Sequence, residues 1–478
     1  MSQRILASEA ACHEDYIIAS LDIDKAFLKG FTYRELAEAT GEKERTVCFT
    51  LPPGSAQILR QFDGYQDYDE SIHCMKCIKP GTGTKDAPRA FSMKLRRVTE
   101  TINLRSTSYD PEFEVAQGLL TAKHVDDINM AGTEEKIDRY QTAVERTFGP
   151  CKIHKHSYVN CAIRYFKDPV HGNVTLDQDE YIKKLRPIVS PELTGAPAEA
   201  EATTSVTNQF VSLRGALAYA LLTQFWLIVY VVSLQRVQKP TNLDVRRLNA
   251  VTRKLQQKPQ KLIYPSMKCV GKVDCHADSG YRRVTSLDEI QKGYGMRGMN
   301  LLRCGDRKGL AHLIDSIGRS HRLTIRSSYA GEALAVSHGF EDAYPTIVTL
   351  HEVRHGILTA AQLKELREVG GLKVEATFTT DAESVFKSLT SRDWKVPTEK
   401  TLLGHICWLR EMLSEGLIKT IRWCDTRDMT ADGHTKGSID RQLLLDAMAG
   451  KMVFRFEVKT YEPYRGSTET QQVTFSQY

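Results

Sequence analysis

The sequence predicts a mixed protein with an α+β part first, helices in the middle and an α/β part towards the C-terminal end. Strand-like segments alternate with helical patterns before about residue 150 and again from about residue 268, and a helical stretch separates the two parts. With 478 residues, 41% hydrophobic and 26% charged, the chain is globular and long enough for two to four domains.

An isolated acid lies in a strand-like segment near the N-terminus. In SLDIDKAFLKG, residues 20–30, Leu21, Ile23 and Phe27 are typical of a buried strand that runs into a turn, and Asp22 lies among them. A carboxylate at this position can reach a site at the end of the strand.

Two adjacent acids, Asp126 and Asp127, lie in the apolar stretch GLLTAKHVDDINMAG and predict the tip of a hairpin. Asp is common in solvated turns for ordinary backbone reasons. Neighbouring carboxylates also repel and raise each other's pKa unless a cation lies between them. With Asp22 as a third carboxylate, the group fits a two-metal site for phosphoryl transfer, where hard oxygen ligands favour Mg²⁺ or Mn²⁺.

Two segments between these acids predict loops when taken alone. TLPPGS, residues 50–55, is a turn signal, and Pro80 to Gly83 within CIKPGTGTKDAPRAF, residues 77–91, is typical of a flexible loop.

The middle of the chain predicts a hairpin and helix over 160–185, a surface linker over 190–209 that is rich in Ala, Thr, Pro and Glu, and helices over 210–260. Residues 215–235 lack charge over a length that could cross a bilayer. Thr223, Gln224 and Ser233 weaken that interpretation, so we expect this segment inside the protein and no membrane partner.

One predicted helix, TNLDVRRLNAVTRKLQQK at 241–258, has an apolar and a basic face. Leu248, Val251 and Leu255 lie on the apolar face. The basic face carries Arg246, Arg247, Arg253, Lys254 and Lys258. Such a helix is either an ordinary solvated helix or one that follows a phosphate backbone.

A second set of acids lies in the C-terminal part. Asp278 follows the strand-like KCVGKVDCHA, Glu332 lies at the start of a helical pattern, and Asp381 ends the strand-like VEATFTT. Asp432 lies in RDMTADGHTKG. Scattered acids are usually surface acids, but three of these four lie at the edges of apolar segments, where carboxylates can share a site. Asp274 is a rival of Asp278, because VDCHADS offers two acids.

The net charge and the cysteines indicate in broad terms which ligands and which cellular compartment the chain suits. A net charge of +6 is compatible with polyanion binding but would not suggest it alone. Eleven irregularly spaced cysteines and no secretory signal favour reduced thiols in the cytoplasm or nucleus. The lone CxxC at Cys74 and Cys77 and the segment CKIHKH at 151–156 lack a set of four metal ligands, so we expect no metal there.

Taken together, the motifs resemble the reverse transcriptase and ribonuclease H region of the Pol polyprotein of copia-type retrotransposons. SLDIDKAFLKG is similar to that family's DVKTAFLNG, TLPPGS to QPPGF, CIKPGTGTKDAPRAF to LKKSLYGLKQAPRAW and HVDDI to YVDDI, in the same order and at similar spacing. Asp22 falls on the family's catalytic position and Asp24 on a variable one. HADSGYRR, RSSYAGEALA, TTDAESVFKSL and TADGHTKGSIDRQL resemble its ribonuclease H motifs SDADW, SSTEAEY, CDNQSAIxLA and LADIFTKAL.

The resemblance implies a ferredoxin-like α+β polymerase palm over 1–189 with most of the fingers missing, the linker at 190–209 and a helical thumb or connection over 210–265. An α/β ribonuclease H-like domain over 266–445 and a C-terminal tail over 446–478 would follow. The implied activities are RNA-directed DNA polymerase and ribonuclease H in an element linked to DNA integration. The implied partners are an RNA template, a DNA primer, an RNA–DNA hybrid and deoxynucleoside triphosphates, with two Mg²⁺ or Mn²⁺ ions per active site.

The implied site residues fall into two groups. The acids expected to bind metal and act in catalysis are Asp22, Asp126, Asp127, Asp278, Glu332, Asp381 and Asp432. The residues expected to contact nucleic acid or substrate are Gly83, Lys85, Pro88, Arg89, Arg246, Arg247, Arg253 and Lys254. His434 would either assist proton transfer or be a surface residue.

Several departures leave two interpretations open. His124 replaces a Tyr of the family, Asp86 a Gln and Ala382 an Asn. The family also has a longer fingers region before its first palm strand, so we expect a C-terminal piece of a Pol polyprotein that self-associates or is completed by a longer precursor. The chain is then either an active polymerase with ribonuclease H, or an impaired remnant that only binds nucleic acid or only cleaves the hybrid.

Overall fold

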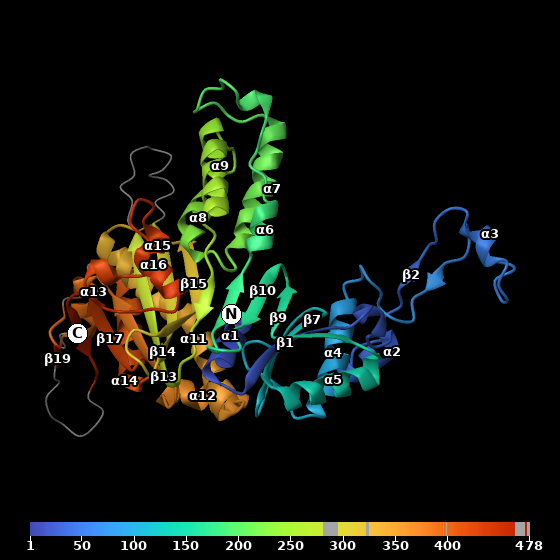
Figure 1. Ribbon diagram of the computed structural model, residues 1–478, viewed down its shortest axis with the longest axis horizontal. Helices are drawn as coiled ribbons and strands as arrows, with labels where there is room; N and C mark the ends of the chain where they lie inside the picture. Colours follow the sequence, from blue (N-terminus) through green and yellow to red (C-terminus); the bar gives the residue numbers. More distant parts are fainter. Residues whose placement is uncertain (281–294, 322–324, 395, 398, 464–473, 476–478) are drawn as a thin grey trace.

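The computed structural model describes residues 1–280, 295–321, 325–394, 396–397, 399–463 and 474–475. Their strands form sheets of six, four, seven and two strands, and helices pack against the three larger ones. In Figure 1 a six-stranded sheet lies on one side, a seven-stranded sheet on the other, and a column of helices rises between them. The mixed α and β character expected from the sequence is confirmed.

The N-terminal sheet has the strand order β4-β5-β6-β7-β1-β8. Its strands are β4 (Arg105–Ser106), β5 (Phe113–Ala116), β6 (Leu119–His124), β7 (Asp127–Thr133), β1 (Tyr16–Asp22) and β8 (Lys152–Lys155). Side chains alternate between its faces. Ala19 and Leu21 of β1 pack with α4 (Ala87–Glu100) and α5 (Glu134–Phe148), whereas Ile18 joins the core on the opposite face.

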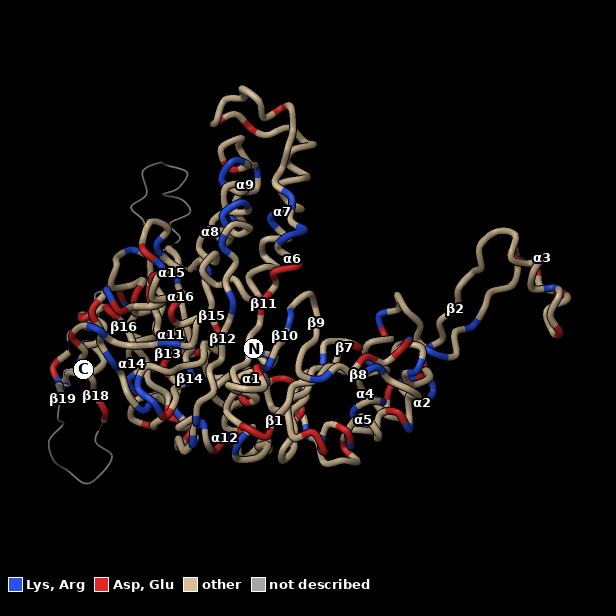
Figure 2. Tube along the Cα trace, in the orientation of Figure 1, with Lys and Arg blue, Asp and Glu red and all other residues tan. Residues whose placement is uncertain are grey.

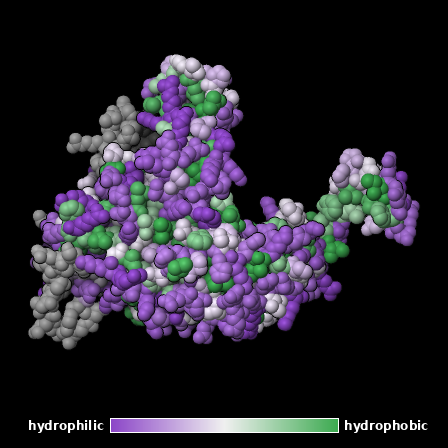
Figure 3. Space-filling view, in the orientation of Figure 1, coloured by the Kyte–Doolittle hydropathy of each residue, from purple (hydrophilic) through white to green (hydrophobic). Residues whose placement is uncertain are grey.

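An extended arm leaves this region after α2 (Tyr33–Thr40), which begins with a capping box formed by Thr32 and Glu35. The arm contains β2 (Cys48–Phe49), α3 (Ser55–Leu59) and β3 (Met75–Lys76), and it projects far from the body of the protein (Figure 1). Figure 3 shows hydrophobic surface on this arm. The large hydrophobic side chains exposed along it include Phe49, Ile58, Phe62, Tyr65 and Ile72.

The middle sheet has the order β12-β11-β10-β9. It consists of β9 (Ser157–Asn160), β10 (Ile163–Lys167), β11 (Val174–Asp177) and β12 (Leu262–Tyr264). The helical column above it contains α6 (Asp179–Lys184), η2 (Pro191–Leu193), α7 (Thr204–Ala220), η3 (Phe225–Leu227), α8 (Ile228–Gln235) and α9 (Asn242–Gln257).

One expectation for this region differs from the structure. The proposed linker 190–209 ends earlier, because Thr203 caps α7 by accepting the N–H of Val206, and Val206 and Phe210 are buried. The uncharged segment 215–235 is interrupted at Thr223 and Gln224, which are buried and hydrogen-bonded, Gln224 donating to Gln260 O at 2.6 Å. Among the described residues, every helix is too short or too polar to cross a membrane.

The C-terminal sheet has the order β15-β14-β13-β16-β17-β18-β19. Its strands are β13 (Cys269–Gly280), β14 (Met296–Gly305), β15 (Ala311–Ser320), β16 (Glu375–Thr380), β17 (Thr420–Cys424), β18 (Val458–Tyr461) and β19 (Thr474–Phe475). β13, β16 and β17 are parallel, and the other pairs are antiparallel. The helices of this part are α11 (Ser328–His355), α12 (Ala360–Val369), α13 (Glu383–Thr390), α14 (Lys400–Glu415), α15 (Asp432–Thr435) and α16 (Gln442–Met448).

The expected tail from residue 446 onwards is therefore not a separate element. Helix α16 runs through residue 446, and β18 pairs with β17 from Ile421↔Tyr461 to Cys424↔Val458. A strand at this position gives the outer edge of β17 hydrogen-bond partners that it would otherwise lack.

Helix α1 (Ser2–Cys12) joins the N-terminal and C-terminal sheets. Ile5, Leu6 and Ala10 are fully buried, and its polar side chains reach across to the C-terminal sheet, where Arg4 donates to Ile314 O at 2.6 Å. Glu9 and Arg303 of β14 form an ion pair in which both side chains are at most 3% exposed. Although burial opposes ionisation, Arg303 and Arg354 hold the pKa of Glu9 well below its usual range.

We predict that Glu9→Ala lowers the free energy of unfolding by about 3 to 5 kcal/mol, because Arg303 would stay buried without its partner. Urea denaturation followed by circular dichroism would measure the change. Glu14→Ala removes an exposed acid just beyond the same helix and should change stability by less than about 0.5 kcal/mol. Similar losses in the two variants would contradict a special role for the buried pair.

Candidate carboxylate sites

The first site is built by antiparallel pairing in the N-terminal sheet. Asp22 at the end of β1 lies opposite Asp127 at the start of β7. The β6–β7 hairpin closes with His124 opposite Asp127, so Val125 and Asp126 form its two-residue turn. Val125 has φ 62°, a left-handed conformation that a β-branched residue rarely adopts and that costs about 1 to 3 kcal/mol. The predicted hairpin is thus present, and it holds its acids beside Asp22.

Asp127 is the most perturbed acid of this group. Burial, Asp126 and Asp22 raise its pKa, and Cys161 Sγ donates a hydrogen bond to Asp127 Oδ2 at 3.7 Å. Burial and the neighbouring Asp127 raise the pKa of Cys161 to about 11, which keeps the thiol protonated as a donor. Cys161 has φ 48° in the tight turn between β9 and β10. No motif in the sequence indicates that this cysteine lies beside the acids.

The motif at residues 77–91 surrounds the start of α4. Gly83 has φ 92°, a turn conformation that suits glycine, and Pro88 lies in the first turn of α4. Lys85 is exposed, whereas Arg89 is paired with Glu42 at 2.8 Å. A nucleic acid at this surface would therefore find Lys85 accessible but would compete with Glu42 for Arg89.

Helix α9 has the two faces that its sequence predicts. Leu248 and Leu255 are buried, whereas the four basic residues of the helix and Lys258 just after it are exposed, and they follow the helical column in Figure 2. Arg246 donates to Ala196 O at 2.7 Å, Arg247 to Asp244 Oδ1 at 3.3 Å, and Lys254 Nζ lies 5.7 Å from the Trp226 ring centroid. These contacts are on or near the protein surface and leave Arg253 exposed.

The second site gathers acids from separate elements of the C-terminal sheet. Asp278 lies in β13, Glu332 in the second turn of α11, and Asp381 directly after β16. One carboxylate oxygen from each lies within 4.8 Å of the others. Across the described residues, Asp22, Asp126 and Asp127 do not meet this criterion together. The C-terminal acids are therefore the more tightly gathered group.

Asp432 completes the second site from α15. This short helix lies close to the sheet because Gly298 has no side chain: a Cβ there would come within 2.9 Å of Ala431 O. Lys436 Nζ lies 2.6 Å from Asp432 Oδ1 and 3.7 Å from Asp278 Oδ1, and Thr435 Oγ1 donates to Asp278 Oδ2. The sequence did not single out Thr435 and Lys436 as site residues, although both lie in the motif TADGHTKGSIDRQL.

Burial and mutual repulsion perturb these acids strongly. Burial and the carboxylates of Asp278 and Asp381 raise the pKa of Glu332 to about 10. Burial and Asp278 raise the pKa of Asp432 to about 8, and burial followed by Asp381 raises that of Asp278. The Ser279 N–H donates to Glu332 Oε2 at 3.2 Å. Without a cation, the cluster therefore keeps protons on Glu332 and Asp432 at neutral pH.

Asp274 does not join this cluster. It lies on the same face of β13 as Asp278 but four residues earlier, roughly 13 Å along the strand. Its carboxylate accepts hydrogen bonds from Thr379 and Arg422, and although burial opposes ionisation, Arg422 keeps the pKa of Asp274 well below its usual range. Asp274 is therefore part of a buried ion pair away from the gathered acids.

His434 is fully buried, which corrects the expectation of a surface residue. Its Nε2 lies 2.8 Å from Ser316 Oγ and 2.7 Å from Asn300 Oδ1. Burial lowers the pKa of His434 to about 3, so it stays neutral near neutral pH. These contacts make it a buried polar anchor for α15.

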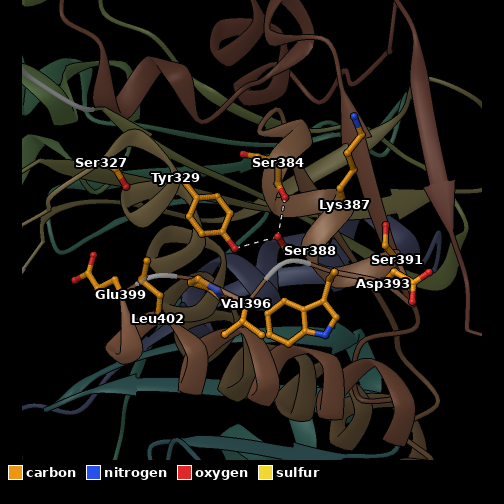
Figure 4. A pocket seen from close by; sticks show the side chains of 12 residues that line it. Ser327, Tyr329, Ser384, Lys387, Ser388, Ser391, Asp393, Val396, Glu399 and Leu402 are labelled. Carbon is orange, nitrogen blue, oxygen red and sulfur yellow. Dashed lines mark hydrogen bonds between the residues drawn. The ribbon is translucent and has the colours of Figure 1, made fainter.

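A pocket of about 700 Å³ opens beside the elements that carry Glu332 and Asp381. Ser327 and Tyr329 line it from the start of α11, and Ser384 and Ser388 from α13, as Figure 4 shows. Tyr329 donates to Ser388 Oγ at 3.0 Å. The pocket provides hydroxyl groups, Lys387 and the acids Asp393 and Glu399, whereas the four clustered acids are not among its lining residues.

The C-terminal acids fit a divalent cation. They supply only oxygen ligands, which Mg²⁺ and Mn²⁺ prefer, and Asp278 Oδ1 is buried without a hydrogen-bond partner. A cation would also relieve the repulsion that raises their pKa values. Fold and site together define a mixed α/β protein. Its C-terminal sheet carries a cluster of carboxylates with the oxygen ligands that a divalent cation prefers.

Comparisons with known proteins give limited similarity. No protein-family model and no curated protein sequence matches the chain. It is similar to a foamy viral protease-reverse transcriptase in complex with an RNA/DNA hybrid, with a TM-score of 0.47, 9% identity and coverage of 89% of this chain. The dsDNA complex of the foamy viral protein gives a TM-score of 0.19 and 11% identity, covering 82% of this chain and 66% of that one. The chain spans 46% of the first neighbour, and both TM-scores are too low to establish a shared fold.

We predict that Glu332→Gln stabilises the metal-free protein at neutral and higher pH. The folded state keeps a proton on Glu332 that the unfolded chain releases above its ordinary pKa of 4.5, so the contribution of this group falls as the pH rises towards 10. Glutamine removes this loss, and the expected gain is about 1 to 3 kcal/mol, since one pKa unit corresponds to about 1.4 kcal/mol. Thermal melts with a chelator would measure it.

The same melts with Mg²⁺ or Mn²⁺ should reverse the order, because the parent gains a ligand that the variant binds poorly. Glu341→Gln, an exposed position on the same helix, is the matched control and should leave both series unchanged. A variant that is less stable than the parent in the chelator would contradict the assigned repulsion.

Proposed function

We propose that the chain is an RNA-directed DNA polymerase joined to a ribonuclease H, of the copia type that its motifs resemble. The observation that carries the nuclease half is the convergence of Asp278, Glu332 and Asp381 within 4.8 Å. The pairing of Asp22 with Asp127 beside Asp126 supports the polymerase half. The substrates would be an RNA template, a DNA primer, deoxynucleoside triphosphates and the RNA–DNA hybrid.

At the nuclease site, Asp278, Glu332, Asp381 and Asp432 would hold the cations. When bound, Mg²⁺ or Mn²⁺ supplies water of lowered pKa and neutralises charge on the phosphodiester. Thr435 and the Ser279 N–H orient the Asp278 and Glu332 carboxylates through hydrogen bonds. Lys436 offsets part of their charge. The hybrid would be recognised by its shape and its 2′-hydroxyl groups.

At the polymerase site, Asp22, Asp126 and Asp127 would bind the cations that assist primer extension. Cys161 fixes one Asp127 oxygen through its thiol. Gly83, Lys85, Pro88 and Arg89 would face the template and nucleotide. The exposed residues Arg246, Arg247, Arg253 and Lys254 of α9 would contact the backbone of the duplex.

A second candidate function is hybrid cleavage without polymerisation. The specific observation in its favour is that the C-terminal acids are gathered more tightly than the N-terminal ones. In that case the N-terminal sheet would help to bind nucleic acid, and the nuclease would be the active half.

The decisive experiment incubates the full chain with Mg²⁺ and an RNA template annealed to a DNA primer, each strand carrying a different label, plus deoxynucleotides. We expect Asp126→Asn with Asp127→Asn to reduce primer extension roughly 100-fold or more and to spare RNA cleavage. Asp381→Asn should have the opposite effect, because it alters only the C-terminal cluster.

Asp24→Asn is the matched control, since Asp24 is exposed two residues after Asp22 and outside the proposed ligand set. Cleavage without extension by the parent chain would favour the second candidate. Equal loss of both activities in each variant would rule out separate sites, and no activity from a folded parent would leave only nucleic-acid binding.

A further inference from the structure

Two cysteines meet where helix α1 contacts the C-terminal sheet. Cys12 is the last residue of α1, and Cys269 is the first residue of β13, the strand that carries Asp278. Their Sγ atoms lie 2.7 Å apart although the residues are 257 positions apart in the sequence. The chain therefore holds two free thiols in contact across its two main parts.

The surroundings favour a thiolate at this contact. The hydrogen bond from Cys12, together with the guanidinium groups of Arg303 and Arg354, lowers the pKa of Cys269 to about 7. The shared hydrogen bond and burial raise the pKa of Cys12, so it is the thiol that donates. Glu9 opposes these cations but is itself paired with Arg303. One sulfur is thus nucleophilic and the other protonated.

The same sulfurs lie within 4.8 Å of a His312 nitrogen, which raises the alternative of a metal site. His312 Nε2 lies 2.8 Å from Pro265 O, a pure acceptor, so this nitrogen carries the proton. Its Nδ1 then accepts the hydroxyl of Ser8 at 2.8 Å. With the free lone pair of His312 already occupied and two guanidinium groups nearby, oxidation fits the site better than a divalent cation.

A cavity lies close to this contact. A cavity of about 900 Å³ is lined by Glu9, His13 and Tyr16 from the α1 side and by Arg354 from α11. Arg354 also donates to Cys269 O at 3.0 Å, so a residue of the cavity wall contacts Cys269, although neither cysteine is among the lining residues. Both cysteines are partly exposed.

We propose that Cys12 and Cys269 form a reversible disulfide when the protein meets a hydroperoxide. The Cys269 thiolate attacks one peroxide oxygen, which forms a sulfenic acid and releases hydroxide from hydrogen peroxide. The Cys12 sulfur then attacks this sulfur and forms the S–S bond, and the sulfenic hydroxyl leaves as water with the proton of Cys12. The hydroxide from the first step takes up the proton that Cys269 gave to the solvent when it ionised. In sum, two thiols lose two electrons and two protons, and one peroxide becomes two waters.

Such a bond would covalently link α1 to the strand that carries Asp278. It would connect the two main parts independently of the Glu9–Arg303 pair, and it does not depend on the activities proposed above. Dithiothreitol would reverse it.

The test uses the full, unmodified chain in a titration with hydrogen peroxide, followed by alkylation of remaining thiols and peptide mapping without reduction. Trypsin would release residues 5–25 and 269–272, each with one cysteine, so their cross-linked product is unambiguous. We expect this product at a peroxide dose at least about tenfold below that which oxidises Cys407, an exposed thiol. The oxidised protein should also melt at a higher temperature until dithiothreitol is added.

Cys12→Ser should leave a sulfenic acid on Cys269 that dimedone traps, and Cys407→Ser should leave the cross-link unchanged. Peptide mapping of the unmodified chain remains a valid test of the disulfide even if Cys12→Ser fails to fold. Alkylation of both cysteines after Cys407 is fully oxidised would overturn the proposal. So would stoichiometric zinc in the purified chain whose removal exposes these two thiols.

Discussion

The buried ion pair between Glu9 and Arg303 marks the contact on which the rest of the structure depends. Helix α1 supplies Ile5, Leu6 and Ala10 to a core that also contains Phe113 of the N-terminal sheet and Leu313 of the C-terminal sheet. Because one continuous core serves both sheets, the two carboxylate sites are held in one framework. Leaving either charge buried without its partner would be costly. The ion pair therefore holds the two sheets in one specific relative position, which apolar contacts alone would not do.

The acids of the two sites are brought together in different ways. Asp22 and Asp127 are placed by strand register, and a strained turn at Val125 presents Asp126. The C-terminal acids come from strand β13, helix α11, the loop after β16 and the short helix α15, whose close approach to the sheet depends on Gly298. In both, folding brings like charges together at a cost that only a bound cation would fully remove. Clusters of carboxylates with strongly perturbed pKa values are typical of functional sites and do not stabilise the fold.

Local sequence patterns predicted much of this architecture. The alternation around Asp22 and the apolar flanks of Asp126 and Asp127 predicted the strand and hairpin, and the two-faced pattern of α9 is present. The patterns did not reveal the role of α1, since its Ser, Arg and Glu side chains look like surface residues until their partners about 300 residues later are known. Asp274 and His434 were ambiguous for the same reason, because burial and pairing are properties of the tertiary structure. Whether the gathered acids catalyse any reaction remains a prediction.

The position of α1 also affects how the chain folds during its synthesis. Its partner Arg303 is synthesised 294 residues after Glu9, which takes about 15 to 60 s at typical rates of translation. During that interval Ile5 and Leu6 lack the cover that the C-terminal sheet supplies, although α1 also packs against β1, β6 and β7, which are synthesised early. The contact between Glu9 and Arg303 therefore closes last, and its closing would be a slow step in folding.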